Sequence, residues 1–145
     1  MQNETSPLCG AVVLVVEDNP DVLEATGYLI EAAFGCTVHT ASSCVEALAL
    51  IDAGRHIDLI FSDVILPGKD GLTLARLARE RLSDLPVALV TGWADEIDSI
   101  TKRGFIALLK PYTVEQLQSV FTDLLCSRIL CTESTPVDQA MRSSP

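Results

Sequence analysis

Asp63 stands directly after a short apolar segment, and this placement makes it the first candidate for chemistry in the chain. The segment is Leu59-Ile60-Phe61-Ser62, and the residues after Asp63 enter a turn at Leu66-Pro67-Gly68. Open α/β sheets bind ligands in the crevice outside the carboxyl ends of their strands. A carboxylate in that position can act as a nucleophile or bind a cation.

Other polar residues follow apolar segments in the same way. Glu17 and Asp18 come after one such segment, Thr91 after a second and Lys110 after a third. Taken singly, each has a structural interpretation: the acidic pair can cap a helix, and Asp63 can form a turn. Their joint placement at strand ends favours one shared site.

The residue types at this site indicate phosphoryl chemistry. Three carboxylates in one pocket (Glu17, Asp18 and Asp63) repel one another unless a cation neutralises them. An all-oxygen site without His or Cys suits Mg²⁺ or Mn²⁺ better than zinc. The Thr91 hydroxyl and the Lys110 ammonium would then neutralise a phosphoryl group on Asp63, as an acyl phosphate requires.

Five apolar segments alternate with amphipathic helical windows, which predicts an α/β fold. The class is a doubly wound (βα)5 unit, a flavodoxin-like three-layer sandwich with a five-stranded parallel sheet. The second segment alternates between polar and apolar residues and is expected nearer an edge. The predicted strands are Val12 to Val16, Thr37 to Ala41, Leu59 to Ser62, Val87 to Val90 and Ile106 to Leu109.

The helices are predicted from capping residues and periodicity. Ser43 with Glu46 and Thr113 with Gln116 form capping boxes, and the fourth helix has only Ile97 and Ile100 as apolar anchors. In the first helix we expect Val22, Ala25, Leu29 and Ala32 to face the core, and in the second Val45, Leu48 and Ile51. The predicted helices cover Pro20 to Phe34, Ser43 to Gly54, Thr73 to Leu82, Asp95 to Arg103, and Thr113 to a point between Leu125 and Cys131.

Length and composition indicate one domain. The chain has 145 residues, 48% of them hydrophobic, and a formal charge of −10. We expect an N-terminal extension at 1–10, the domain at 11–128, and a flexible tail or linker at 129–145. With no targeting segment and no membrane span, a cytoplasmic location is the default expectation.

The charged residues and cysteines exclude other classes of function. Ten Lys and Arg residues scattered through an acidic chain argue against direct nucleic-acid binding. Five cysteines without CxxC spacing are interpreted as buried or idle thiols in a reducing compartment.

Four motifs resemble the receiver domain of two-component response regulators. They are Val-Val-Glu-Asp-Asn at 15–19, Ser-Asp-Val-Ile-Leu-Pro-Gly-Lys-Asp-Gly at 62–71, Val-Thr-Gly-Trp at 90–93 and Leu-Leu-Lys-Pro-Tyr-Thr at 108–113. The resemblance covers about Val12 to Leu125.

This resemblance implies a role for each site residue. Asp63 would be the phosphoacceptor, taking the group from a sensor histidine kinase or a phosphotransfer protein. Mg²⁺ would be held by Glu17, Asp18, Asp63 and the backbone carbonyl of Ile65. Thr91 and Lys110 would bind the phosphoryl oxygens, and the Lys110–Pro111 peptide bond would be cis.

The resemblance is incomplete at one position, and two alternatives remain open. Many receivers carry Tyr or Phe where this chain has Ala107, so Trp93 is the candidate switch aromatic. One alternative is a phosphorylation-independent receiver that acts by protein binding. The other is a haloacid dehalogenase-type phosphohydrolase, which requires a second aspartate where Ile65 stands. The effector is expected on another chain or outside this sequence, and a homodimer is possible.

Overall fold

The computed structural model describes residues 8–126. One parallel sheet forms the middle layer, with the strand order β2-β1-β3-β4-β5. The predicted doubly wound, flavodoxin-like class is therefore confirmed. The strands are β1 (Val12–Val16), β2 (Thr37–Ala41), β3 (Leu59–Asp63), β4 (Val87–Thr91) and β5 (Ile106–Leu109).

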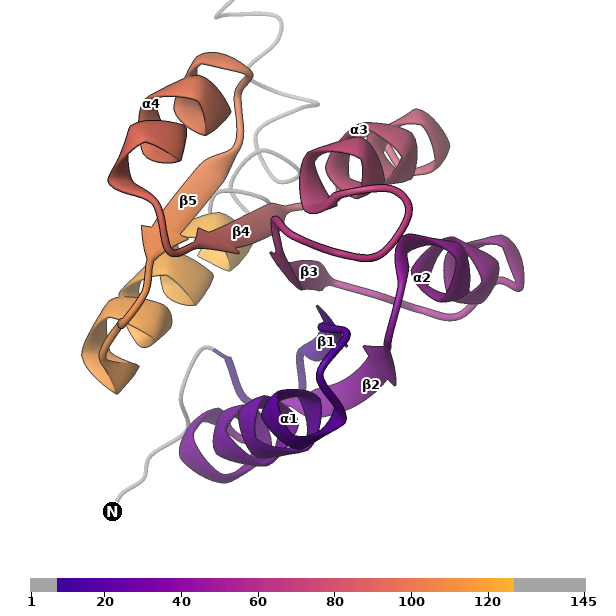
Figure 1. The fold of residues 1–145 in the computed structure, drawn as a ribbon. Coiled ribbons are helices and arrows are strands. Elements are labelled where there is room, and N and C mark those ends of the chain that lie inside the picture. Colours follow the sequence, from indigo (N-terminus) through magenta and orange to yellow (C-terminus); the bar gives the residue numbers. More distant parts are fainter. Residues whose placement is uncertain (1–7, 127–145) are drawn as a thin grey trace, which may run out of the picture.

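Helices cover both faces of the sheet (Figure 1). On one face lie α1 (Pro20–Phe34) and a C-terminal helix over residues 114–126. The other face carries α2 (Cys44–Asp52), α3 (Gly71–Arg81) and α4 (Ala94–Lys102). Within residues 8–126, no helix has the length and apolar content needed to cross a bilayer.

Burial along the strands follows their place in the sheet. The central strands β3 and β4 are buried along almost their whole length, as expected for strands covered on both faces. The alternating segment forms β2 at one edge, as predicted, and only its last residue is buried. Because β1 and β4 flank β3, the end of β3 lies at the centre of the sheet.

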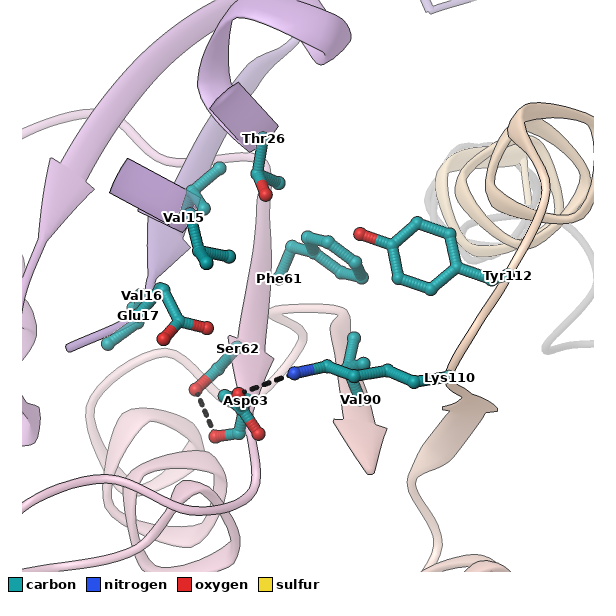
Figure 2. A pocket seen from close by; sticks show the side chains of 11 residues that line it. Val15, Val16, Glu17, Thr26, Phe61, Ser62, Asp63, Val90, Lys110 and Tyr112 are labelled. Atoms are coloured by element: carbon teal, nitrogen blue, oxygen red, sulfur yellow. Dashed lines mark hydrogen bonds and ion pairs between the residues drawn. The ribbon is translucent and has the colours of Figure 1, made fainter. Parts of the chain in front are cut away.

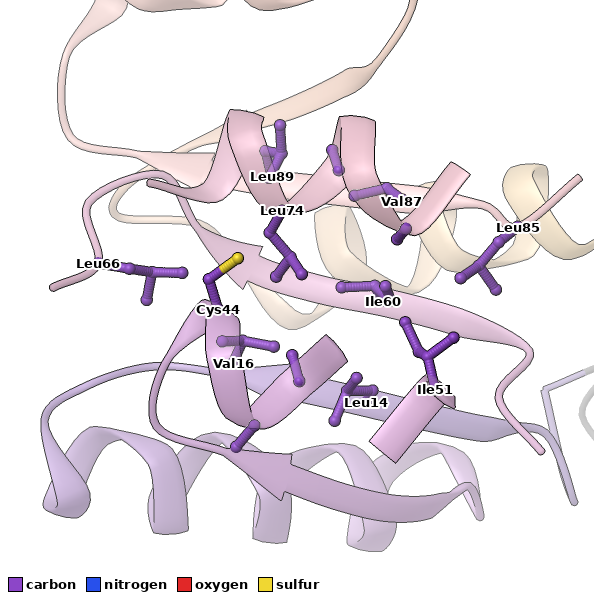
Figure 3. Packing of buried hydrophobic residues seen from close by; sticks show 14 of the residues in the cluster. Leu14, Val16, Cys44, Ile51, Ile60, Leu66, Leu74, Leu85, Val87 and Leu89 are labelled. Carbon is purple, nitrogen blue, oxygen red and sulfur yellow. The ribbon is translucent and has the colours of Figure 1, made fainter. Parts of the chain in front are cut away.

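Two apolar clusters hold the layers together. Leu14, Ile60, Leu74 and Leu89 belong to the cluster between the sheet and the α2–α3–α4 layer (Figure 3). On the other face Phe121 packs edge-on against Phe34 and Phe61, with ring centroids 5.9 and 5.4 Å apart. Aromatic rings at this separation stabilise the packing by more than the burial of their apolar area alone.

One predicted capping box is complete and the other is half formed, because the Glu46 carboxylate accepts the Ser42 N–H and not that of the N-cap residue Ser43. The Ser43 hydroxyl accepts the Glu46 N–H at 3.1 Å. Thr113 and Gln116 bond reciprocally, at 3.0 and 2.9 Å. Helix α3 begins two residues earlier than predicted because the Asp70 side chain caps it, accepting the Thr73 N–H at 2.9 Å.

Most of the predicted buried face of α1 was wrong, although Leu29 packs partly on the core. In α2 the prediction is confirmed for Ile51 and for the partly buried Leu48 but was wrong for Val45. Helix α1 buries Gly27, Ile30 and Phe34, while Val22 is 41% exposed. Gly27, Ile30 and Phe34 are three or four residues apart and therefore lie on one side of the helix. Packing on the sheet buries this side because it carries the larger Ile30 and Phe34 side chains. In α2 the buried residues are Cys44, Ala47 and Ile51, and Val45 is 71% exposed. In α4 only Ile100 is buried, as its sparse anchors predicted.

The N-terminal boundary differs from the expected extension. Leu8 is fully buried in the cluster beneath α1, so the packed unit includes at least this residue of segment 1–10. The predicted tail at 129–145 lies outside the described residues. Of the described cysteines, Cys36 and Cys44 are buried and Cys9 is exposed. Burial raises the pKa of Cys36 to about 11, which keeps this thiol unreactive.

Candidate functional site

The sheet register brings the predicted residues to one edge. Asp63 pairs with Val90 and Thr91 pairs with Leu109, so Lys110 follows directly beside Thr91. On the other side Val16 pairs with Ser62, which places Glu17 next to Asp63. Figure 2 shows the Glu17, Asp63 and Lys110 side chains converging there from three strands.

Asp63 forms an ion pair with Lys110 at the centre of this site. The Lys110 Nζ lies 2.9 Å from Asp63 Oδ2, and the Asp63 side chain is only 13% exposed. The second oxygen, Oδ1, accepts the Ile65 N–H at 3.3 Å. Burial by itself would lower the pKa of Lys110, but the bond to Asp63 outweighs burial and the pKa is raised. The ammonium therefore stays charged at neutral pH.

Glu17 is a buried acid beside this pair. Its carboxylate accepts the Asn19 N–H at 3.0 Å. Burial, with a smaller contribution from Asp63, raises the pKa of Glu17 to about 7. Glu17 therefore exchanges its proton near neutral pH, and the Lys110 ammonium offsets the charge of Asp63.

Asp18 does not join this cluster. Its side chain is exposed and does not line the cavity beside Asp63. Across residues 8–126, no three His, Cys, Asp or Glu side chains are grouped as a metal site. Two carboxylates from Glu17 and Asp63 nevertheless fit Mg²⁺ in kind, because this ion commonly binds one or two protein carboxylates and keeps several waters.

The Thr91 hydroxyl is bonded toward α4. Thr91 is 2% exposed, and its hydroxyl donates to the carboxylate of Glu96 in the first turn of α4. The Trp93 N–H donates to the same hydroxyl oxygen at 3.1 Å, while the Trp93 side chain is 62% exposed. Sequence reasoning missed Glu96, because nothing in its spacing from Thr91 separates it from an ordinary acid in a first helical turn.

Gly71 supports the backbone of the site and was also missed. Its N–H donates to the Val64 carbonyl at 2.7 Å. A Cβ at this position would lie 2.9 Å from the Val64 Cα and would also clash with the Asp63 backbone. The Ser62 hydroxyl donates to the Asp63 carbonyl at 2.8 Å (Figure 2). A glycine at the start of a helix close behind Asp63 was the available signal.

A small cavity lies behind the acidic pair. Its volume is about 30 Å³, and Thr26, Phe61 and Tyr112 line its inner part. Tyr112 packs edge-on against Phe61, with ring centroids 5.9 Å apart. A space of this size holds only one or two water-sized groups. A phosphoryl group on Asp63 would therefore lie on the solvent side.

The Lys110–Pro111 peptide bond is cis.

The fold and this edge define a doubly wound α/β domain with a paired carboxylate at the end of its central strand, and comparison identifies the family. The family described as "Response regulator receiver domain" matches residues 13–122. The chain belongs to this family and is a receiver domain of two-component signalling.

Similar proteins and structures agree with this assignment. Sensor kinase CckA of Brucella abortus is 35% identical over 79% of this chain and 12% of its own length. Transcriptional regulatory protein AruR of Pseudomonas aeruginosa is 34% identical over 90% of this chain and 56% of its own. The chain thus spans much less than these whole proteins.

Solved structures include a receiver domain from hybrid histidine kinase CckA. It is 33% identical, with a TM-score of 0.66, covering 79% of this chain and 99% of that one. Response regulator TrrA from Thermotoga maritima, in complex with Mg(2+)-BeF, is 25% identical with a TM-score of 0.72. That alignment covers 79% of this chain and 99% of TrrA.

Proposed function

We propose that Asp63 accepts a phosphoryl group from the phosphohistidine of a sensor histidine kinase or a phosphotransfer protein. The observation that carries the proposal is the Asp63 carboxylate at the end of the central strand, paired with Lys110 at 2.9 Å. This carboxylate is positioned, nearly buried and next to a fixed positive charge. These are features that phosphoryl transfer requires.

The transfer is a displacement at phosphorus. Asp63 Oδ1 is the more weakly held oxygen, since its bond from the Ile65 N–H is 3.3 Å long whereas Oδ2 lies 2.9 Å from the Lys110 ammonium. Oδ1 forms the new bond to phosphorus while the bond from phosphorus to the partner's imidazole nitrogen breaks. The electron pair of that bond stays on the leaving imidazole. Lys110 can then pair with a phosphoryl oxygen.

The oxygen ligands at this edge suit Mg²⁺, with Mn²⁺ as an alternative. Glu17, Asp63 and the Ile65 carbonyl would hold the ion, and Asp18 would join them from the solvent side. When bound, the ion supplies positive charge between the acceptor carboxylate and the phosphoryl oxygens. Glu17 would have to be ionised to hold the ion, so its raised pKa should make metal binding stronger as pH rises through about 7.

Phosphorylation then acts on α4 through Thr91. A phosphoryl group offers several charged acceptors for the Thr91 hydroxyl and competes with Glu96 for it. Loss of the Thr91–Glu96 bond frees the first turn of α4, a helix with only Ile100 buried. A segment with so few buried contacts shifts at low cost. Trp93, at the N-cap of α4, would move with it and supply the changing aromatic surface.

The output of this domain is a change in its protein partners. We propose that residues 11–128, together with the buried Leu8, form the receiver unit and that its effector is another chain or a domain outside this sequence. A homodimer is one form that the switched state can take. The domain accepts one phosphoryl group and loses it slowly, without turnover of small substrates.

Labelling with acetyl phosphate tests the proposal. Wild-type protein with Mg²⁺ should gain one hydroxylamine-labile phosphoryl group, seen by intact mass, and EDTA should abolish the gain. Asp63→Asn should abolish it too, whereas Asp70→Asn should retain it because Asn also caps α3. Absence of label would favour the phosphorylation-independent receiver. Sustained turnover of p-nitrophenyl phosphate would favour the phosphohydrolase.

A further inference from the structure

A groove runs between α3 and the loop from α4 to β5, apart from the Asp63 cavity, and it shares no lining residue with that cavity. Its volume is about 630 Å³. The α3 side contributes residues one turn apart, and the loop from α4 to β5 contributes the opposite wall. The residues that carry the argument are Leu72, Arg76, Arg79, Arg103 and Phe105.

The groove gathers positive charge on an acidic chain. Arg76 and Arg79 come from α3, and Arg103 is the C-cap of α4. Arg103 is far from the two α3 arginines in the sequence, so neither the sequence nor the net charge of −10 indicates that the three meet. The only acid lining the groove is Asp70, whose Oδ1 already accepts the Thr73 N–H. A cleft lined by one sign of charge focuses its field on an incoming partner of opposite sign.

The guanidinium groups are available to an anionic partner. Arg79 lies 4.5 Å above the Phe105 ring and donates from Nε to the Leu85 carbonyl, so its position is set before binding. Arg76 meets Glu80 only at 3.6 Å, and both side chains are mostly exposed, so this ion pair is weak. Arg103 is exposed and forms no ion pair with any residue in the described range.

The floor of the groove is apolar. Leu72 and Phe105 are partly buried and pack on the core cluster beneath. The rim residues Arg76 and Arg103 are exposed, so the groove opens to solvent and would not enclose a small molecule. An apolar floor between cationic walls matches a peptide segment with apolar residues on one face and carboxylates beside them.

We propose that this groove binds an acidic amphipathic segment of a partner protein. Carboxylates of the segment pair with Arg76, Arg79 and Arg103, and its apolar side chains cover Leu72 and Phe105. The acidic remainder of the receiver surface repels such a segment elsewhere, which orients it into the groove. This binding needs no phosphorylation of Asp63, so it stands apart from the proposed phosphoryl transfer.

The test is fluorescence anisotropy on the full chain with a designed probe. The probe is a fluorescein-labelled helical peptide of about 14 residues, long enough for about four turns, with Leu on one face and Glu on its flanks. We expect saturable binding that weakens with added salt. A matched peptide with Lys in place of Glu should not bind.

Charge-reversal variants locate the binding. Arg103→Glu and Arg76→Glu should each weaken binding roughly tenfold, as expected from loss of one charge-assisted pair. Arg55→Glu, the same change on the exposed Arg55 outside the groove, should leave it within about twofold. Both rim residues are exposed, so these variants should fold normally, which circular dichroism checks.

Four results would overturn the proposal. One is failure of the acidic peptide to bind, and another is equal weakening by Arg55→Glu and Arg103→Glu. The third is displacement of the peptide by pyrophosphate at equimolar concentration, which would indicate a small-anion site. A dimer in sedimentation that Arg103→Glu dissolves would likewise replace the partner segment with a second copy of the chain.

Discussion

Glu96→Gln is the sharpest test of how phosphorylation would reach α4. The variant keeps an oxygen acceptor for the Thr91 hydroxyl but removes the charge of the carboxylate. A hydrogen bond to a charged group contributes about 1.5–3 kcal/mol, against about 0.5–1.5 kcal/mol for a neutral one. The Thr91 bond should therefore weaken by about 1–1.5 kcal/mol in the variant.

That energy sets the size of the expected effect. If a phosphoryl group must displace Glu96 as the partner of the Thr91 hydroxyl, a weaker Thr91–Glu96 bond lowers the free-energy cost of that displacement by the same amount. An energy difference of this size corresponds to about a tenfold change in affinity. Because Glu96 is partly exposed, we expect Glu96→Gln to bind a phosphoryl mimic about fivefold to tenfold more tightly than the wild type.

Beryllofluoride with Mg²⁺ provides the assay, as a stable substitute for the phosphoryl group. Trp93 is the only tryptophan in the chain, and its backbone N–H bonds to Thr91, so its fluorescence should report binding directly. Titration of wild-type protein and Glu96→Gln gives the two affinities. Amide exchange at residues 92–104 should show faster exchange when beryllofluoride is bound.

Asp95→Asn is the matched control, since Asp95 lies in the same first turn of α4 and the change in charge is identical. Both variants lose the favourable interaction of an acid with the helix N-terminus. Of these two acids, only Glu96 bonds to the Thr91 hydroxyl. Equal beryllofluoride affinities in Glu96→Gln and Asp95→Asn would refute a competition for the Thr91 hydroxyl.

Further predictions concern pH, packing and the lifetime of the acyl phosphate. Without divalent cations, the free energy of unfolding should fall by up to about 3 kcal/mol as pH rises from 4.5 to about 7, because folded Glu17 retains a proton that the unfolded chain has lost. Urea titrations of wild type against Glu17→Gln isolate this effect; parallel pH profiles would contradict it. Gly71→Ala should cost about 1–3 kcal/mol in thermal unfolding and lower phosphoryl labelling, since its Cβ overlaps the site's backbone. Gly92→Ala, where a Cβ meets nothing within 4 Å, should do neither. Replacing both Ile65 and Trp93 with Ser should speed loss of the phosphoryl group, because bulky side chains hinder attacking water; an unchanged decay rate would count against shielding.

Much of the fold could be predicted from the sequence because its signals are local. The apolar segments and the capping boxes predicted all five strands and the starts of α2 and the C-terminal helix. Parallel strands then place their carboxyl ends at one edge, so the meeting of Glu17, Asp63 and Lys110 followed from strand assignment alone. The misassigned face of α1 shows the limit of this reasoning. Two apolar stripes overlap on that helix, and only docking on the sheet selects Ile30 and Phe34.

The sequence alone determined which residues stand at the strand ends, and with them the class of chemistry. Only the tertiary structure decided which groups those residues touch: Glu96 on the Thr91 hydroxyl, Gly71 against the Asp63 backbone, and three arginines around one groove. The reason is physical. The sequence pattern that marks a strand and its end extends over only a few neighbouring residues. A hydrogen bond or a shared groove instead depends on angstrom-scale distances between elements far apart in the chain.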